Sequence, residues 1–88
     1  AVATNGERAN VESTLRVTEL LPLFDEVVAA EDVKHGKPAP DVFLEAARRM
    51  HVVAGRCVAF EDSDEGLMAA RAAGMRVVDI REYFVPEY

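Results

Sequence analysis

Residues 36–41, Gly-Lys-Pro-Ala-Pro-Asp, place a single lysine in a stretch of restricted backbone. Proline fixes its own φ angle and limits the residue before it, so Pro38 and Pro40 stiffen the chain around Lys37. Two interpretations are open from these residues alone. The stretch is either a rigid loop that starts a helix, with Pro40 in the first turn and Lys37 in solvent, or a frame that points the ammonium group at something fixed.

Further polar residues follow directly after apolar segments of the chain. Thr4, Asn5 and Gly6 follow "AVA", and Glu61 and Asp62 follow "CVAF". Mg²⁺ takes oxygen ligands, usually one or two carboxylates together with water. An ammonium group, a hydroxyl and backbone N–H groups hold phosphate oxygens. These residue types therefore suggest a phosphate site with a divalent metal, in which the acidic pair holds Mg²⁺ and the others, with the framed lysine, hold the phosphate.

Each of these residues also has a purely structural interpretation. Thr4 is β-branched and suits a strand. Asp62 with Glu65 three residues later is the acidic form of a capping box, so Asp62 could be only a helix cap. Glu31 and Asp32 are expected to be solvated or to support the lysine loop.

Three residues that often bind metals or react are expected to do neither. His35 and His51 are assigned to the surface, because no second metal-binding residue lies at a suitable spacing. Cys57 lies inside an apolar run and is expected to be buried in the core.

Apolar runs and helical patterns alternate along the chain and must position these residues. Strands are expected at 1–4, 27–29, 57–60 and 75–80, and helices at 7–21, 41–50 and 63–74. The first helix would turn Val11, Leu15 and Thr18 inward and stop at Pro22. The last would end at Gly74 in a left-handed cap.

The second helix would turn its apolar residues toward the core. These residues are Val42, Phe43, Ala46, Ala47 and Met50.

The strands are continuous apolar runs, which indicates a parallel sheet covered on both faces by helices. The expected fold is therefore α/β, a Rossmann-like arrangement of three layers. Ligands of such sheets bind beyond the carboxyl ends of the strands. This arrangement would bring Thr4, Lys37 and Glu61 to one edge.

Composition limits the classes of partner. The chain has 88 residues and a net charge of −6, which suits a single domain and argues against nucleic acid or an anionic membrane as a partner. The single cysteine excludes an internal disulfide and suits a reducing compartment. No apolar run is long enough to span a membrane, and no basic-then-apolar start is present. A cytoplasmic location is the expectation.

The segments "AVATNG", "LLPLFDEVVAAEDVKHGKPAPDVFLEAARRM" and "CVAFEDSDEGLMAARAAGMRVVDI" together resemble the haloacid dehalogenase superfamily. The nearest branch contains phosphatases and β-phosphoglucomutase-like enzymes. The resemblance implies that Thr4 binds the transferring phosphoryl group with help from Asn5, and that Lys37 stabilises charge on the nucleophile and the phosphate. It also implies that Glu61 and Asp62 hold Mg²⁺.

Two parts of the family pattern do not occur in these 88 residues: the first motif, D-x-D-x-[TV] on the first strand, and the helical cap domain. The resemblance implies that residues 1–80 are the C-terminal portion of the family's core domain and that residues 81–88 are a tail. The absent strand would lie between the strands that end at Thr4 and at Glu61. A missing N-terminal segment or another chain would then be needed to complete the sheet, and the 88 residues alone are expected to be inactive.

The expected function is Mg²⁺-dependent hydrolysis of a small phosphate monoester, such as a sugar phosphate, through an aspartyl-phosphate. The nucleophile would lie outside this chain. Alternatives are a sugar-phosphate mutase of the β-phosphoglucomutase kind and a non-catalytic phosphate-binding remnant. A dehalogenase of 2-haloacids is a further alternative, but it needs no Mg²⁺, so the retained acidic pair argues against it.

Overall fold

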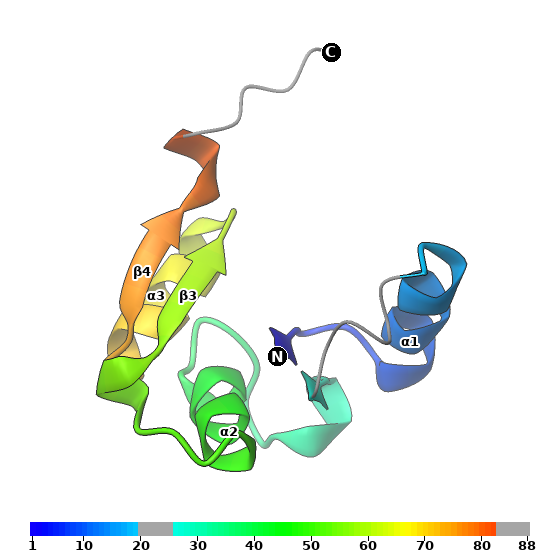
Figure 1. Cartoon of the computed structure of the whole chain (residues 1–88), viewed down its shortest axis with the longest axis horizontal. Helices are drawn as coiled ribbons and strands as arrows, with labels where there is room; N and C mark the ends of the chain where they lie inside the picture. Colours follow the sequence, from blue (N-terminus) through cyan, green and yellow to red (C-terminus); the bar gives the residue numbers. More distant parts are fainter. Residues whose placement is uncertain (20–25, 83–88) are drawn as a thin grey trace.

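A computed structural model of the chain describes residues 1–19 and 26–82. Strands and helices alternate as predicted (Figure 1). The strands are β1 (Val2–Ala3), β2 (Val27–Val28), β3 (Val58–Glu61) and β4 (Arg76–Asp79). The helices are α1 (Arg8–Val17), α2 (Asp41–Arg49) and α3 (Asp64–Ala72), with short 3₁₀ turns η2 (Ala30–Asp32), η3 (Ala54–Arg56) and η4 (Ile80–Glu82).

The described strands form two separate parallel pairs, β1 with β2 and β3 with β4. Val2 is paired with Val27, and Val58 with Arg76. In Figure 1, β3, β4 and α3 lie on one side of the molecule, β1, β2 and α1 lie on the other, and α2 lies between them. Parallel pairing is confirmed, and β1 and β3 face each other without being bonded.

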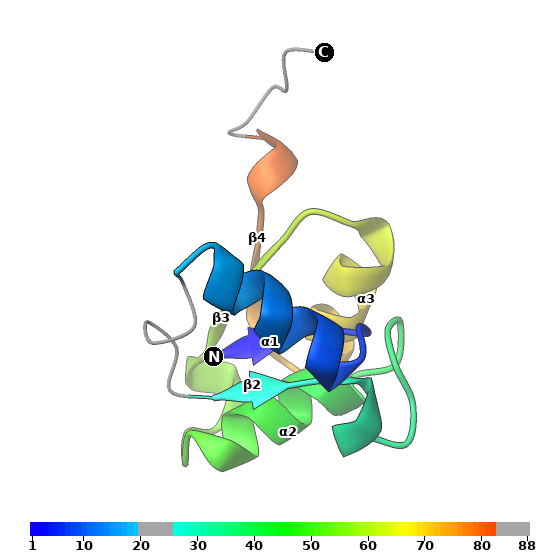
Figure 2. The same cartoon turned by 90° about the vertical axis from the view of Figure 1, so that its right-hand side faces the viewer.

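Helix α2 lies at the centre of the core, because it packs against β1, β2 and α3 and shares one buried cluster with Ala59 of β3. Val42 is fully buried, as is Val28 of β2, and Phe43, Ala46 and Ala47 are also buried. Figure 2 shows α1 in front of β1 and β2, with α2 beneath them. The predicted inner face of α2 is confirmed apart from Met50, which is only half-buried.

Helix α1 is shorter and less buried than predicted. It ends at Val17, and none of its residues is buried. Val11 and Leu15 are half-buried, whereas Thr18 is exposed, so the prediction that Thr18 faces inward is wrong. The Thr18 hydroxyl donates to the carbonyls of Thr14 and Leu15, which satisfies the helix end instead. Pro22, the predicted stop, lies outside the described residues.

One face of β3 is exposed in the described part of the chain. Ala59 and Glu61 are buried, but Val58 and Phe60 on the opposite face are 49% and 68% exposed. Cys57, just before the strand, is half-buried rather than part of the core. Among residues 1–19 and 26–82, helices therefore cover this strand on one face only.

Helices α2 and α3 end in the same way. After α3, the N–H groups of Gly74 and Met75 donate to the carbonyls of Arg71 and Ala70, and Gly74 has a φ angle of 84°. These bonds form a Schellman motif, and the predicted left-handed cap at Gly74 is confirmed. His51 takes the equivalent place after α2 with a φ angle of 57°.

Among the described residues, no helix has the length and apolar character to cross a membrane.

Candidate active site

Other residues hold both the backbone and the ammonium group of Lys37. Its backbone N–H donates to Asn5 Oδ1 over 2.8 Å, and its carbonyl accepts from Asn5 Nδ2 over 3.4 Å. Its ammonium nitrogen lies 3.2 Å and 3.4 Å from the two carboxylate oxygens of Glu61 and 5.1 Å from the centre of the Phe43 ring. The side chain is only 13% exposed. The interpretation that places Lys37 in solvent is therefore wrong.

The Thr4 hydroxyl lies at the carboxyl end of β1 and organises the turn that follows. It accepts a hydrogen bond from the Gly6 N–H over 3.0 Å, and the Thr4 N–H donates to the Val28 carbonyl over 2.9 Å. A hydroxyl that accepts one bond can still donate its own hydrogen. Thr4 can thus offer a donor to a ligand, whereas the Gly6 amide, predicted as a phosphate ligand, is already engaged.

Glu61 ends β3 with a side chain that is 10% exposed. The space that it fills depends on Gly66 in the first turn of α3. A Cβ atom on Gly66 would lie 1.6 Å from Glu61 Oε2, so any larger residue would collide with the carboxylate. The glycine of the "EDS..G" sequence therefore makes room for the acid that pairs with Lys37.

Asp62 is exposed and is not the cap of α3. Ser63 occupies the N-cap position and accepts a hydrogen bond from the Gly66 N–H over 3.0 Å. The capping interpretation of Asp62 is therefore wrong, because the next residue already performs that task. Within residues 1–19 and 26–82, the Asp62 side chain makes no hydrogen bond or ion pair, so its oxygens remain available to a ligand.

The acidic pair fits a Mg²⁺ ion in chemistry but does not form a complete metal site. No group of three or more His, Cys, Asp or Glu residues in the described chain is placed to hold a metal. Mg²⁺ commonly takes one or two protein carboxylates and completes its octahedral shell with water or phosphate oxygens. Glu61 and Asp62 can supply that share.

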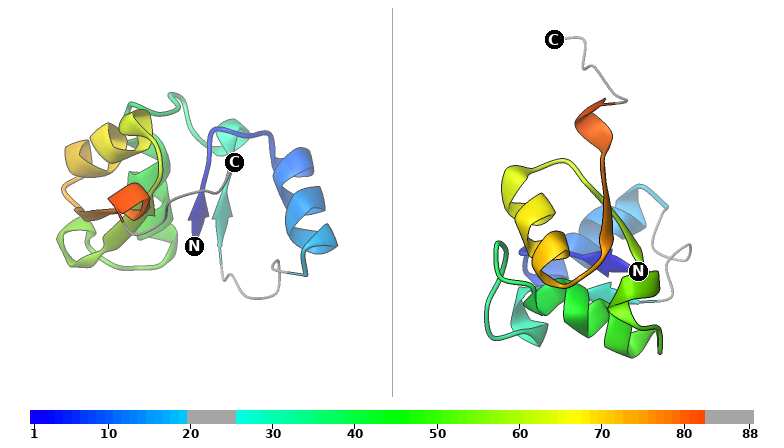
Figure 3. Two further views of the ribbon diagram at one scale, coloured as in Figure 1. Left: turned by 90° about the horizontal axis from the view of Figure 1, so that it is seen from above. Right: turned by 90° about the vertical axis from the view of Figure 1, so that its left-hand side faces the viewer.

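Three of the predicted residues are linked directly. Asn5 follows β1, Lys37 follows β2 and Glu61 ends β3, and hydrogen bonds join them in that order. The left panel of Figure 3 shows that the segments after β1, β2 and β3 lie on the same side of the molecule. The predicted common edge is therefore present for these strands.

The end of β4 carries an acid that is paired with an arginine. Both carboxylate oxygens of Asp79 accept hydrogen bonds from Arg81 over 2.9 Å, and Arg81 also binds Asp64 over 2.9 Å. The hydrogen bond from the Arg81 side chain lowers the pKa of Asp79. Arg81 therefore pairs with two acids and fastens the end of β4 to the start of α3.

A second ionic cluster supports the beginning of the lysine loop. Asp32 accepts from the Ala29 N–H over 2.9 Å and pairs with Arg8 and, over 3.6 Å, with Arg49. Arg8 also donates to the Val27 carbonyl over 2.9 Å. The sequence shows only a helical Arg8 and Glu12 pair, so the longer-range part of this cluster could not be predicted. The cluster makes Asp32 a support of the loop rather than a solvated residue.

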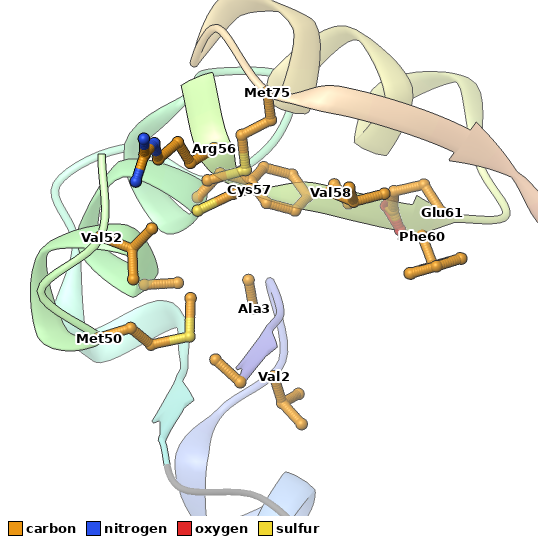
Figure 4. Close-up of a pocket in the computed structure, with 14 residues that line it drawn as sticks. Val2, Ala3, Met50, Val52, Arg56, Cys57, Val58, Phe60, Glu61 and Met75 are labelled. Atoms are coloured by element: carbon orange, nitrogen blue, oxygen red, sulfur yellow. The ribbon is translucent and has the colours of Figure 1, made fainter. Parts of the chain in front are cut away.

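A groove separates the two strand pairs, with a volume of about 630 Å³. Figure 4 shows Val2 and Ala3 of β1 on one side of it and Val58 and Phe60 of β3 on the other. The lining is mostly apolar: Ala1, Val2, Ala3, Phe43, Ala46, Met50, Val52, Arg56, Cys57, Val58, Ala59, Phe60, Glu61 and Met75. We call this cavity the β1–β3 groove.

The backbone on both sides of the β1–β3 groove has unused hydrogen-bonding groups. Val2 and Thr4 direct their N–H groups at β2, so Ala3 between them directs its own toward the groove. On the other side, the Cys57 carbonyl accepts from Arg76. By the same alternation, Val58 and Phe60 direct their N–H and C=O groups away from β4.

The arrangement has known counterparts. The sequence model of the family described as haloacid dehalogenase-like hydrolase matches residues 1–74. The fructose-1-phosphate phosphatase YqaB of Escherichia coli is 56% identical over 81 residues, which cover 92% of this chain and 43% of that protein. The phosphorylated carbohydrates phosphatase of Thermotoga maritima is 39% identical over 75 residues, covering 85% of this chain and 35% of the phosphatase.

Solved structures share the fold. CbbY from Rhodobacter sphaeroides, crystallised in complex with phosphate, has a TM-score of 0.80 and 39% identity, over 86% of this chain and 35% of that protein. The chain thus spans less than half the length of each of these relatives.

Proposed function

Because the chain belongs to the haloacid dehalogenase-like hydrolases, we propose that the protein containing it hydrolyses a small phosphate monoester, with a sugar phosphate as the first candidate. The observation that carries this proposal is the fixed ammonium group of Lys37, which is shielded from solvent between Glu61 and Phe43. A preorganised positive charge in a shielded site stabilises the negative charge that develops during phosphoryl transfer. The named activities of two relatives, on fructose 1-phosphate and on phosphorylated carbohydrates, support the substrate class.

Each residue of the site has a proposed role. Lys37 binds phosphate oxygens and stabilises their charge, while Glu61 keeps its ammonium group oriented over 3.2 Å. The Thr4 hydroxyl donates to a second phosphate oxygen. Glu61 and Asp62 would hold Mg²⁺, which supplies charge neutralisation at the phosphate when bound. The acid that attacks phosphorus is proposed to come from outside residues 1–88.

We propose that the same outside segment fills the β1–β3 groove as a strand. A strand parallel to both neighbours would satisfy the groove-facing backbone groups of Ala3 on one side and of Val58 and Phe60 on the other. The carboxyl end of such a strand would emerge at the edge where Asn5, Lys37 and Glu61 are linked. A residue at that end would therefore lie beside the phosphate site.

The direct test compares two lysines of one loop in the full-length protein. Hydrolysis of p-nitrophenyl phosphate is measured with Mg²⁺ and with a chelator. We expect Lys37→Ala to lower kcat by about 10²- to 10³-fold, the size of effect seen when one preorganised electrostatic donor is removed. Lys34→Ala is the matched control, because Lys34 is an exposed lysine three residues away.

Three results would decide against the proposal or part of it. Equal effects of the two substitutions would remove the role assigned to Lys37, and full activity in chelator would remove Mg²⁺. Turnover of a sugar phosphate into its isomer, without release of phosphate, would favour the mutase alternative over the hydrolase.

A further inference from the structure

We infer that Asn5 is a positioning residue, whose side chain locks the loop after β1 to the loop after β2 and thereby sets the place of the Lys37 ammonium group. This inference rests on the proposed function for its catalytic consequence. It differs from the role that the resemblance implies, in which Asn5 assists the phosphoryl group directly.

The Asn5 side chain is used on both of its polar ends. Its oxygen accepts the Lys37 N–H over 2.8 Å, and its nitrogen donates to the Lys37 carbonyl over 3.4 Å. Both partners are main-chain groups of a single residue 32 positions further along the chain. An amide side chain bound in this manner acts as a short piece of strand pairing, so it fixes both the position and the orientation of the residue that it holds.

The glycine at position 36 leaves room for the Asn5 side chain. A Cβ atom at this position would lie 2.7 Å from Asn5 Oδ1 and 3.1 Å from its Cγ. The backbone of Gly36 does not have a positive φ angle, since Gly74 is the only glycine of the described chain that does. Glycine at position 36 is therefore explained by the close approach of the Asn5 side chain and not by an unusual backbone.

Backbone hydrogen bonds hold the residues on both sides of Asn5. The Thr4 N–H donates to the Val28 carbonyl, and the Gly6 carbonyl accepts from the Ala30 N–H, each over 2.9 Å. Asn5 thus connects a fixed turn to the middle of a long loop. Lysine is a flexible side chain, and both its backbone and its ammonium group must be held for its charge to be preorganised. Glu61 holds the second of these, and Asn5 holds the first.

A substrate-binding role and a positioning role give different results in a double-mutant cycle. Asn5→Ala removes the lock. Gly36→Ala keeps Asn5 but pushes its side chain away from Lys37, because the new Cβ atom would lie 2.7 Å from Asn5 Oδ1. If both substitutions act through the same contact, their effects must not add.

The experiment measures kcat and KM of the full-length protein for a phosphate monoester. We expect Asn5→Ala and Gly36→Ala each to lower kcat by about 10- to 100-fold, as small misplacements of catalytic groups do, with little change in KM. The double variant should be no slower than Asn5→Ala alone. Asn10→Ala, on the exposed surface of α1, is the matched control and should leave both parameters unchanged.

Hydrogen exchange of the Lys37 amide, followed by NMR, provides a readout independent of activity. The amide should be protected in the parent protein and exchange rapidly in both single variants. Additive effects on kcat, a rise in KM confined to Asn5→Ala, or unchanged exchange would each overturn the inference. A parent protein without phosphatase activity would refute the proposed function, and the exchange result would still decide whether Asn5 holds Lys37.

Discussion

Because Gly66 has no side chain, the carboxylate of Glu61 has room beside the first turn of α3. Glu61 is buried at the end of a strand, where a carboxylate is tolerated only if it is paired. Lys37 supplies the pairing charge at 3.2 Å, and Gly66 supplies the space. Glu61 and Gly66 lie in one short stretch, and Lys37 lies 24 residues before Glu61. The buried carboxylate therefore needs both a local space and a partner from another loop.

We therefore predict that Gly66→Ala damages both stability and activity. The new methyl group would overlap Glu61 Oε2 at 1.6 Å and push the carboxylate away from Lys37. Overpacking of this kind costs about 1 to 3 kcal/mol. Denaturant unfolding and phosphatase assays of the full-length protein measure the two effects.

Gly55→Ala is the matched control for this prediction. No heavy atom lies within 4 Å of a Cβ built on Gly55, and its φ angle is not positive. This substitution should be neutral or should stabilise the protein by up to about 1 kcal/mol, because it restricts the unfolded chain. If Gly66→Ala were equally harmless, Glu61 would not be confined as described.

At the scale of elements, the two Schellman motifs offer an internal comparison. His51 and Gly74 make the same backbone bonds after α2 and α3, with φ angles of 57° and 84°. The left-handed region costs a residue with a Cβ atom about 1 to 2 kcal/mol and costs glycine little. We predict that His51→Gly raises the free energy of unfolding by up to about 1 kcal/mol and that Gly74→Ala lowers it by a similar amount. Changes of the same sign would show that the two helix ends differ.

Asp32 joins η2 to both α1 and α2, and its charge makes that junction dependent on pH. The hydrogen bond from the Ala29 N–H, together with Arg8, lowers the pKa of Asp32 below its ordinary value of 3.8. A lowered pKa stabilises the fold above the ordinary value, and this contribution is lost as the pH falls through the lowered one.

We predict that Asp32→Asn destabilises the full-length protein by about 1 kcal/mol near pH 7, since hydrogen bonds to a charged group are lost. The difference from the parent protein should shrink steadily as the pH falls below 3.8, where the parent loses the same charge. Denaturant unfolding at a series of pH values measures it. A difference that stays constant in acid would mean that the charge of Asp32 contributes nothing.

Sequence patterns predicted the elements well and their surroundings less well. The order of strands and helices depends on local apolar runs and on turn residues such as Gly74, so it could be predicted. For the site, the sequence predicted which residue types follow the strands but not which of them are in contact. That Ser63 and not Asp62 caps α3 depends on which of two adjacent residues begins the helix, and both suit an N-cap. That Asn5 binds Lys37 depends on a contact between residues 32 positions apart in sequence. The exposure of Val58 and Phe60 was also missed, because an apolar run does not show which of its faces is covered.

The whole molecule is organised around the β1–β3 groove. Helix α2 packs against β1 and β2 and against α3, and so connects the two strand pairs, yet β1 and β3 share no hydrogen bond. Unpaired backbone groups are costly when they are buried away from water. Phe60 is 68% exposed beside the groove, which adds apolar surface to the same region. If the proposed strand fills the groove, the properties of this part of the molecule should change most.

Native-state hydrogen exchange of the full-length protein tests this difference residue by residue. If a parallel strand fills the groove, the amides of Ala3, Val58 and Phe60 must be protected, because their N–H groups point into it. Val2 and Thr4 serve as internal references, since their amides are bonded to β2 and should be protected whatever the groove contains. Protection of the references alone would mean that no strand lies between β1 and β3. The acid that attacks phosphorus would then have to reach Lys37 from some other direction.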